Sequence, residues 1–481
     1  MVDFSDGPHP GGFAAPMRYD AEILDCEVEG TIPPELDGVF VRTGPDWYYP
    51  QLYPNDVPFS ADGYTSTFRI KNGRAAYRGR FVRTPRFVNN LEAGRQLYGV
   101  YRNPFTDDPS IQEETMEKPW ERTVANTTPM AFAGKLFALK EDAPPIELDP
   151  NTLETRGFYD FGGKLSSQTH TAHPKPDPVT GDLWTFGYEA TGLCTDDVYF
   201  YCFGPDGSLK HEIRVKTPYV SMMHDLIITN EHIVIPVFSY IATMERLKAG
   251  LAHWGWDPSL PGYFGVMRRD GDGSDLKWYD APSGTTIIHT LNGHSSGDRL
   301  VMEAPQFDNN PFPFFPAVHA QTGDMGPIGR SHLRRFTFDL NGDSFATEQV
   351  FDDPISDLVR VDDRYLTQEH RYCYTQYTEP GVQDRGSGWI RLDVQTGEKA
   401  VWYAGPGQAL QEVSMVPRSA DAAEGDGWLI GVANNPAEMR SEFVIVDAVE
   451  MQEVARVILP FRSSAQVHAR WFNAAELPEM V

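Results

Sequence analysis

Short hydrophobic stretches recur along the chain, and a turn sequence separates each stretch from the next. The clearest pairs are rich in aromatic and β-branched residues and occupy residues 68–84, 198–215, 263–281, 333–351 and 389–404. Asn72-Gly73 divides the first pair, and this dipeptide suits the positive φ angles of a tight hairpin turn. The pattern therefore predicts a series of antiparallel strand pairs.

About seven such hairpin units lie between residues 38 and 460 at intervals of roughly 50 to 60 residues. This regular spacing predicts radial repetition, and so an all-β fold: a seven-bladed β-propeller with helices and loops capping one face. A pair of β-sandwiches is the alternative. No linker or low-complexity stretch divides the chain, so we expect one β-propeller catalytic domain over residues 1–481. Helical periodicity predicts one clear helix, over residues 239–254.

Composition and charge exclude several classes of partner. The chain is 41% hydrophobic, which is enough for a large core, and its formal net charge is −27. Nucleic acids and anionic membrane surfaces both require basic faces, so neither is an expected partner. The sequence has no apolar run near the ~18 residues of a membrane helix, no signal-peptide pattern and no disulfide framework in its four cysteines. We expect a cytoplasmic protein without membrane insertion.

Four of the 13 histidines stand near the ends of predicted strands: His173, His224, His289 and His468. Their separations are about one, one and three blade lengths, so in a propeller they would converge on the central axis. A single histidine in such a position is usually a core residue. Four in matching positions favour a metal site, because imidazole is the commonest metal ligand in proteins.

Eight segments, in order and spacing, resemble the carotenoid cleavage oxygenase superfamily. They cover essentially the whole chain and occupy residues 32–45, 59–73, 77–84, 136–145, 171–181, 222–229, 287–294 and 411–430. The resemblance implies a dioxygenase that cleaves alkenes with O₂ at a non-haem Fe(2+), with the same four histidines as ligands.

The resemblance also implies carboxylates that orient the ligand histidines through their second ring nitrogens. Glu141 and Glu412 match two of them. The third family glutamate stands in a Glu-Phe-Pro-Arg stretch, and the corresponding residues here run from Asp357 to Arg360. Asp357 would take this role with a shorter side chain.

In detail the chain looks closest to the lignostilbene α,β-dioxygenase branch, which cleaves the interphenyl double bond of 4-hydroxystilbenes to two aromatic aldehydes. The resemblance implies that Tyr101 and Lys135 are the catalytic residues that bind the phenolic oxygen, and that Phe59 and Phe307 flank the substrate. A phenol has a pKa near 10, so an ammonium and a hydroxyl at its oxygen would favour the phenolate, whose electron density activates the alkene.

Other functions stay open. The same iron could cleave an apocarotenoid or an isoeugenol-type phenylpropene. From a different class, the chain could be a propeller binding module or a metal-dependent hydrolase, and metal analysis would separate these from an oxygenase. The small aromatic alkene and O₂ are the expected partners, and the family resemblance also suggests a homodimer.

Overall fold

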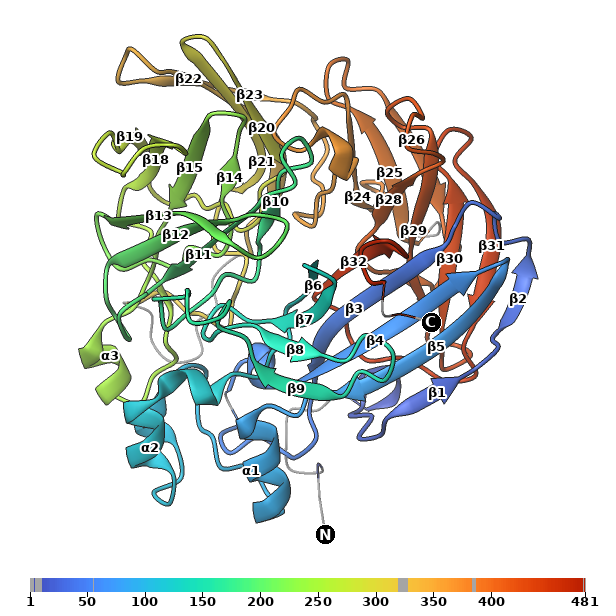
Figure 1. The fold of residues 1–481 in the computed structure, drawn as a ribbon, viewed down its shortest axis with the longest axis horizontal. Helices are drawn as coiled ribbons and strands as arrows, with labels where there is room; N and C mark the ends of the chain where they lie inside the picture. The colour runs from blue at the N-terminus through green and yellow to red at the C-terminus, as the bar shows by residue number, and fades with distance from the viewer. Residues whose placement is uncertain are drawn as a thin grey trace. The chain divides into compact units, whose positions relative to one another are not determined.

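The computed structural model describes residues 4, 11–54, 56–318, 328–382, 386–478 and 480 (Figure 1). The chain forms two compact units. The first comprises Met1–Leu165, Gly381–Trp389 and Val401–Val481, and the second comprises Ser166–Pro380 and Ile390–Ala400. Because the chain leaves the first unit and returns to it, neither unit is a continuous segment, and the single catalytic domain stays a prediction.

Strands dominate both units. In the described part of the chain, seven sheets have three to six strands each, and an eighth has two. The α-helices there are short: α1 (Pro85–Ala93), α2 (Gln112–Glu117) and α3 (Met244–Lys248). The predicted fold class, an all-β seven-bladed β-propeller, is confirmed, with the seven larger sheets as its blades. That helices and loops cap one face stays a prediction.

The first unit contains three sheets. In spatial order, the strands of the first sheet are β1 (Ala21–Ile23), β5 (Arg74–Phe81), β4 (Asp62–Lys71), β3 (Gly38–Asp46) and β32 (His468–Asn473). Those of the second are β2 (Glu27–Gly30), β31 (Gln452–Ile458), β30 (Arg440–Asp447), β29 (Gly427–Asn435) and β27 (Ala409–Leu410), with β28 (Ser414–Pro417) also paired to β29. Those of the third are β6 (Thr128–Phe132), β7 (Lys135–Leu139), β8 (Ile146–Leu148) and β9 (Thr155–Phe158).

The two ends of the chain meet within this unit. β32 pairs with β3, and β2 pairs with β31, as Figure 1 shows. The prediction that N- and C-terminal segments share a blade is therefore confirmed. This pairing covers sheet edges that would otherwise be exposed.

The second unit contains three four-stranded sheets and the two-stranded one. The first four-stranded sheet consists of β10 (Lys175–Pro176), β11 (Leu183–Tyr188), β12 (Asp197–Phe203) and β13 (Leu209–Lys216), and the second of β14 (Ile227–Ile228), β15 (His232–Val237), β18 (Gly262–Arg268) and β19 (Lys277–Ala281). The third consists of β20 (Asn292–Ser296), β21 (Arg299–Phe307), β22 (Ser331–Asp339) and β23 (Phe345–Gln349). The two-stranded sheet consists of β16 (Tyr240–Ile241) and β17 (Gly255–Trp256). The remaining sheet consists of β24 (Tyr372–Tyr377), β25 (Gly388–Asp393) and β26 (Lys399–Tyr403).

Local sequence explains two features of this fold. Asn72 and Gly73 have φ angles of 53° and 71° and form the predicted tight turn between β4 and β5. The helix predicted over residues 239–254 is wrong in extent, because α3 covers only Met244–Lys248. Thr243 caps its start by accepting from the Arg246 amide, and Gly250 at φ 75° turns the chain away after it. Tyr240 and Ile241 form β16, which pairs with β17 directly after the segment.

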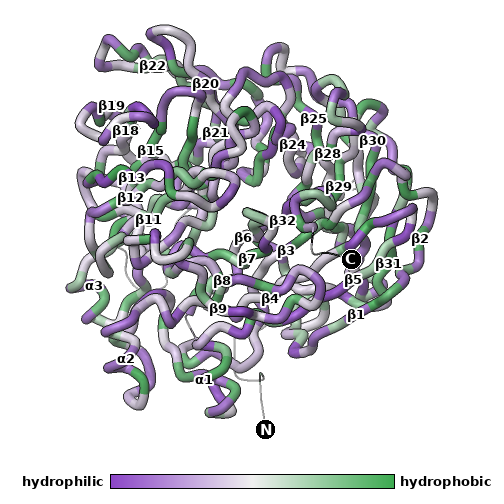
Figure 2. The backbone as a smooth tube through the Cα atoms, viewed as in Figure 1, coloured by the Kyte–Doolittle hydropathy of each residue, from purple (hydrophilic) through white to green (hydrophobic). Residues whose placement is uncertain are grey.

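Hydrophobic and hydrophilic residues both occur along the strands in Figure 2, and some strands, such as β11 and β15, are buried along their whole length. Buried clusters join neighbouring sheets, for example Phe40, Phe68 and Phe443 in the first unit. Among the described residues, no helix combines the length and the apolar character needed to cross a membrane.

Candidate metal centre and phenol-binding site

Three of the predicted histidines meet in the second unit. His173, His224 and His289 each stand two or three residues before the first strand of a different sheet, namely β10, β14 and β20. The Nε2 atoms of His173 and His224 are 2.9 Å apart, and those of His224 and His289 are 3.1 Å apart. Equivalent positions in successive sheets therefore bring the three rings to one point.

A carboxylate orients His289. Its Nδ1 lies 2.8 Å from Oδ2 of Asp357. Because a carboxylate accepts hydrogen bonds, Nδ1 of the neutral ring carries the proton and Nε2 presents a lone pair to the other imidazoles. Asp357 thus makes the contact that the sequence comparison left in doubt, despite its shorter side chain.

His468 has the same kind of partner in the first unit. It is the first residue of β32, and its Nδ1 lies 3.1 Å from Oε1 of Glu412. The other oxygen of Glu412 accepts a hydrogen bond from the Ala469 amide at 2.7 Å. Both side chains are buried. The backbone contact fixes the carboxylate, and the carboxylate fixes the ring, so Nε2 is the nitrogen that His468 would offer to a metal.

The donor set fits a metal ion. Lone pairs of imidazole nitrogens about 3 Å apart repel each other unless a proton or a cation lies between them. A metal with imidazole bonds of about 2.1 Å at right angles separates its ligand nitrogens by about 3.0 Å, close to the spacing observed here. Imidazole suits iron, zinc, copper and nickel, so the geometry supports a transition metal without choosing one.

Tyr101 lies in the first unit, in a buried polar cluster. Its hydroxyl donates to Oε1 of Glu141 at 3.0 Å, and its amide donates to Oδ1 of Asp56 at 2.9 Å. Burial, with the nearby Glu141 carboxylate as the next cause, raises the pKa of the Tyr101 hydroxyl well above its usual value. Tyr101 therefore stays protonated and can act as a hydrogen-bond donor.

Lys140 lies beside Tyr101 and is the cation of this cluster. Its Nζ is 5.1 Å from the centroid of the Tyr101 ring and 5.4 Å from that of Phe59. It donates to Oδ1 of Asn126 at 3.0 Å and to the backbone oxygen of Phe59 at 3.3 Å. Among the described residues, no carboxylate lies within ion-pair distance, and the third ammonium donor has no partner. Burial lowers the pKa of Lys140.

The predicted role of Lys135 is wrong. Lys135 is the first residue of β7, its side chain is 37% exposed, and its Nζ forms an ion pair with Glu147 at 2.7 Å. Lys140 follows the opposite end of the same strand, about 17 Å away at the rise of an extended chain. The family resemblance pointed to Lys135, five residues before Lys140. The signal that could have favoured Lys140 is that it directly precedes Glu141, which is itself a predicted site residue.

The two predicted phenylalanines have different surroundings. Phe59 lies in the 3₁₀ helix Pro58–Ser60, half-buried, with its ring beside Lys140. Phe307 is buried at the end of β21 in the second unit, where its backbone bonds to Thr286 in both directions. A role for Phe307 beside a substrate stays a prediction.

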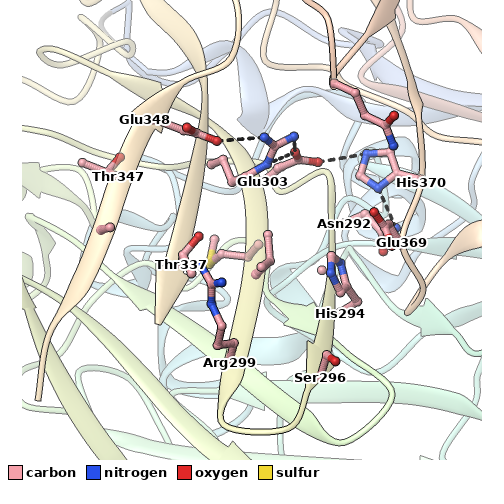
Figure 3. A pocket seen from close by; sticks show the side chains of 16 residues that line it. Asn292, His294, Ser296, Arg299, Glu303, Thr337, Thr347, Glu348, Glu369 and His370 are labelled. Carbon is pink, nitrogen blue, oxygen red and sulfur yellow. Dashed lines mark hydrogen bonds and ion pairs between the residues drawn. The ribbon is translucent and has the colours of Figure 1, made fainter. Parts of the chain in front are cut away.

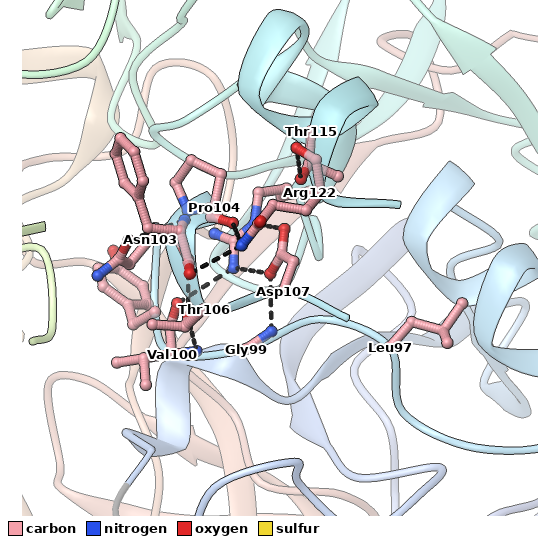
Figure 4. A network of polar contacts seen from close by, with 12 residues as sticks. Leu97, Gly99, Val100, Asn103, Pro104, Thr106, Asp107, Thr115 and Arg122 are labelled. Carbon is pink, nitrogen blue, oxygen red and sulfur yellow. Dashed lines mark hydrogen bonds and ion pairs between the residues drawn. The ribbon is translucent and has the colours of Figure 1, made fainter. Parts of the chain in front are cut away.

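A buried ion pair holds the segment that carries Tyr101 (Figure 4). Arg122 donates to both oxygens of Asp107, at 2.7 and 2.8 Å, and to the backbone oxygen of Val100 at 3.1 Å. Asp107 also accepts from the Gly99 amide at 2.8 Å. A two-pronged contact of this kind fixes geometry as well as adding energy, so the backbone before Tyr101 is rigidly placed. Sequence analysis missed both residues, because nothing local distinguishes them from surface charges.

A separate polar cavity of about 860 Å³ lies in the second unit (Figure 3). It is lined by residues of β20–β23, with His370, Glu369 and Gln395. Buried Glu303 pairs there with both Arg335 and His370. None of the predicted site residues lines this cavity. Its charges compensate one another, so it does not compete with Lys140 as a site for an anion.

Comparisons with known proteins agree with this geometry. The family model described as retinal pigment epithelial membrane protein matches residues 14–473. Lignostilbene-α,β-dioxygenase isozyme III of Sphingomonas paucimobilis is 38% identical, over 99% of both chains. Resveratrol cleavage oxygenase 1 of Aspergillus fumigatus is 36% identical, over 98% of this chain and 97% of the relative.

A solved structure supports the same assignment. The crystal structure of Pseudomonas brassicacearum lignostilbene dioxygenase has a TM-score of 0.92 and 35% sequence identity, and the match covers 98% of this chain and all of that one. The match to the family model, the identities and the shared fold extend over nearly the whole chain. The protein therefore belongs to the retinal pigment epithelial membrane protein family, that of the carotenoid cleavage oxygenases, whose members cleave alkenes.

Proposed function

We propose that this protein is a non-haem iron(II) dioxygenase that cleaves the central double bond of 4-hydroxystilbenes to two aromatic aldehydes. One observation carries the substrate assignment: Lys140 is a buried ammonium that forms no ion pair with any described carboxylate and has one unused donor, beside the hydroxyl-bearing ring of Tyr101. A buried charge with no direct ion pair is costly, although the carboxylates of Asp142 and Glu141 offset part of that cost from a distance. A phenolate oxygen would supply a negative charge in direct contact.

His173, His224, His289 and His468 are the proposed ligands of the iron, and Asp357 and Glu412 orient two of them. The converging Nε2 atoms of the first three, and the carboxylate contact that His468 shares with His289, support this set. When bound, iron(II) would supply the centre at which O₂ becomes reactive toward the alkene. One alkene and one O₂ yield two carbonyl groups, so both oxygen atoms enter the products and no reductant is needed.

The residues of the first unit act on the phenol end of the substrate. Lys140 Nζ would donate to the phenolic oxygen, and the proton of the Tyr101 hydroxyl, which Glu141 accepts in the structure, would turn to the same oxygen and help to stabilise its ionised form. The phenolate then delocalises charge through the ring into the double bond, which becomes more nucleophilic. Phe59 would flank the ring. A long polyene without such an oxygen leaves the ammonium unpaired, so this site disfavours apocarotenoids.

Product analysis tests the substrate assignment. The iron(II)-loaded protein is incubated in air with 4-hydroxystilbene, 4-methoxystilbene, isoeugenol and an apocarotenal. We expect two aldehydes from 4-hydroxystilbene, with ¹⁸O from ¹⁸O₂ in both, and little product from the 4-methoxy compound, which cannot ionise. Preferred cleavage of the apocarotenal would overturn the assignment. Faster turnover of isoeugenol would support the proposed phenol site but would show that the substrate is a phenylpropene and not a stilbene.

Metal analysis tests the centre itself. We expect about one iron per chain and its loss in His468→Ala with the fold retained, as judged by circular dichroism. Retention of calcium or zinc with hydrolytic activity would favour a hydrolase, and a chain that binds no metal would be a binding module. We further propose that the protein acts in the cytoplasm on small aromatic alkenes, without a nucleic-acid or membrane partner. A homodimer stays a prediction that light scattering can test.

A further inference from the structure

The carboxamide of Asn126 joins two parts of the proposed phenol site. Asn126 is fully buried between the loop of Phe59 and the ammonium of Lys140. Its Nδ2 donates to the backbone oxygens of Phe59, at 3.0 Å, and Ala61, at 2.8 Å. Its Oδ1 accepts from Lys140 Nζ at 3.0 Å. One side chain therefore holds the loop that carries the Phe59 ring and also orients the ammonium group of Lys140.

We propose that Asn126 is the positioning residue that makes the site specific for phenols. This inference rests on the proposed function and adds a residue that determines its specificity. Two acceptors, Asn126 Oδ1 and the Phe59 carbonyl, take two ammonium donors and direct the third. Because both acceptors are neutral, neither forms an ion pair with Lys140, and its third donor is left for the substrate.

A carboxylate in the same place would do the opposite. In Asn126→Asp, an anion would lie about 3 Å from the ammonium, at the distance of Oδ1 in the native side chain. The internal ion pair would compete with the phenolate for the same cation. Asn126→Ala would remove the acceptor and leave the ammonium undirected.

The experiment measures phenolate binding without turnover. Metal-free protein is titrated under anaerobic conditions with 4-hydroxystilbene, and the red-shifted absorbance of the phenolate reports ionisation of the bound ligand. The ratio of kcat/KM for 4-hydroxystilbene over 4-methoxystilbene is measured separately with iron-loaded protein. For Asn126→Asp and Asn126→Ala we expect loss of the phenolate band at neutral pH and a drop in the ratio of about 10- to 100-fold, the range of a lost hydrogen bond to a charged group.

A second buried asparagine provides the matched control. Asn292 in the second unit also donates through Nδ2 to two backbone oxygens, those of Tyr365 and Gln368. Its Oδ1 accepts a hydrogen bond from the Thr367 amide. Asn292→Ala should keep the phenolate band and the ratio. If the Asn126 variants fold and also keep both, the proposal for Asn126 is wrong. If wild-type protein shows neither the band nor the preference, the proposed function itself fails.

Discussion

The two lysines at the ends of strand β7 place the same side chain in opposite environments. Lys135 begins the strand, is 37% exposed and pairs with Glu147. Lys140 follows its end, is 5% exposed and bonds only to a carboxamide and a carbonyl. The first charge has a carboxylate in direct contact, whereas the second has only neutral hydrogen-bond partners, with the carboxylates of Asp142 and Glu141 farther away.

The difference supports the proposal that Lys140, and not Lys135, binds the substrate. The Lys135–Glu147 pair is partly exposed on the lysine side, where solvent screens it, so we expect it to contribute only about 1 kcal/mol to stability. A buried ammonium with neutral partners costs stability in the empty protein. Under the proposed function, part of that cost would be recovered when a phenolate binds, and Lys140 would thereby contribute to affinity for the phenolate.

Removing the metal is expected to have the largest effect, because it should abolish the reaction and leave substrate binding intact. Treatment with a chelator, or the variant His224→Ala, is expected to abolish aldehyde formation, because dioxygen then has no centre at which to react. Anaerobic binding of 4-hydroxystilbene should persist, since Lys140 and Tyr101 do not depend on the metal. Loss of the phenolate band together with the metal would show that the ion, and not the lysine, ionises the phenol.

Exchanging each lysine for methionine compares them directly. Lys140→Met removes a charged donor and should lower kcat/KM for 4-hydroxystilbene by roughly 10- to 150-fold, which corresponds to 1.5–3 kcal/mol. Lys135→Met should change it by less than about twofold, because only an exposed pair is lost. Steady-state kinetics on both variants checks this. A larger effect at Lys135 would reverse the assignment made here.

Deleting the Tyr101 hydroxyl is expected to have a smaller effect. Tyr101→Phe removes one donor to the phenolate oxygen and should reduce kcat/KM for 4-hydroxystilbene by about 10-fold, the lower end of the range for a hydrogen bond to a charged group, while the 4-methoxy substrate is less affected. The Glu141 carboxylate loses its donor in the same variant, so the iron content should be measured alongside. Unchanged discrimination between the two substrates would remove Tyr101 from the phenol site.

The pH dependence should show the smallest effect. Burial lowers the pKa of Lys140, so its ammonium deprotonates at lower pH than that of an exposed lysine. As pH rises, kcat/KM for 4-hydroxystilbene should therefore fall severalfold before the ordinary lysine pKa of 10.5 is reached. Lys140→Met should lack this alkaline decline, and Lys135→Met should retain it. A pH profile on the three proteins gives the comparison.

Much of the molecule could be predicted from local sequence. Alternating hydrophobic stretches and turn dipeptides such as Asn72-Gly73 define strand pairs, because side-chain direction and φ preference are properties of a few neighbouring residues. The four histidines stood out for a similar reason, since each occupies an equivalent position in a repeated unit. The helix at residues 239–254 failed, because periodicity alone did not register the cap at Thr243 or the turn at Gly250.

The strand pattern, the family and the histidines that meet in the second unit could be predicted from the sequence. The three-dimensional contacts were needed to show which lysine of residues 135–140 is buried, that Asp357 reaches His289, that Asn126 bonds to Lys140, and that Arg122 pairs with Asp107. These facts depend on burial and on contacts between residues distant in sequence. The free energy of a charge is set by the groups and the water around it, and the linear order of residues does not contain that information.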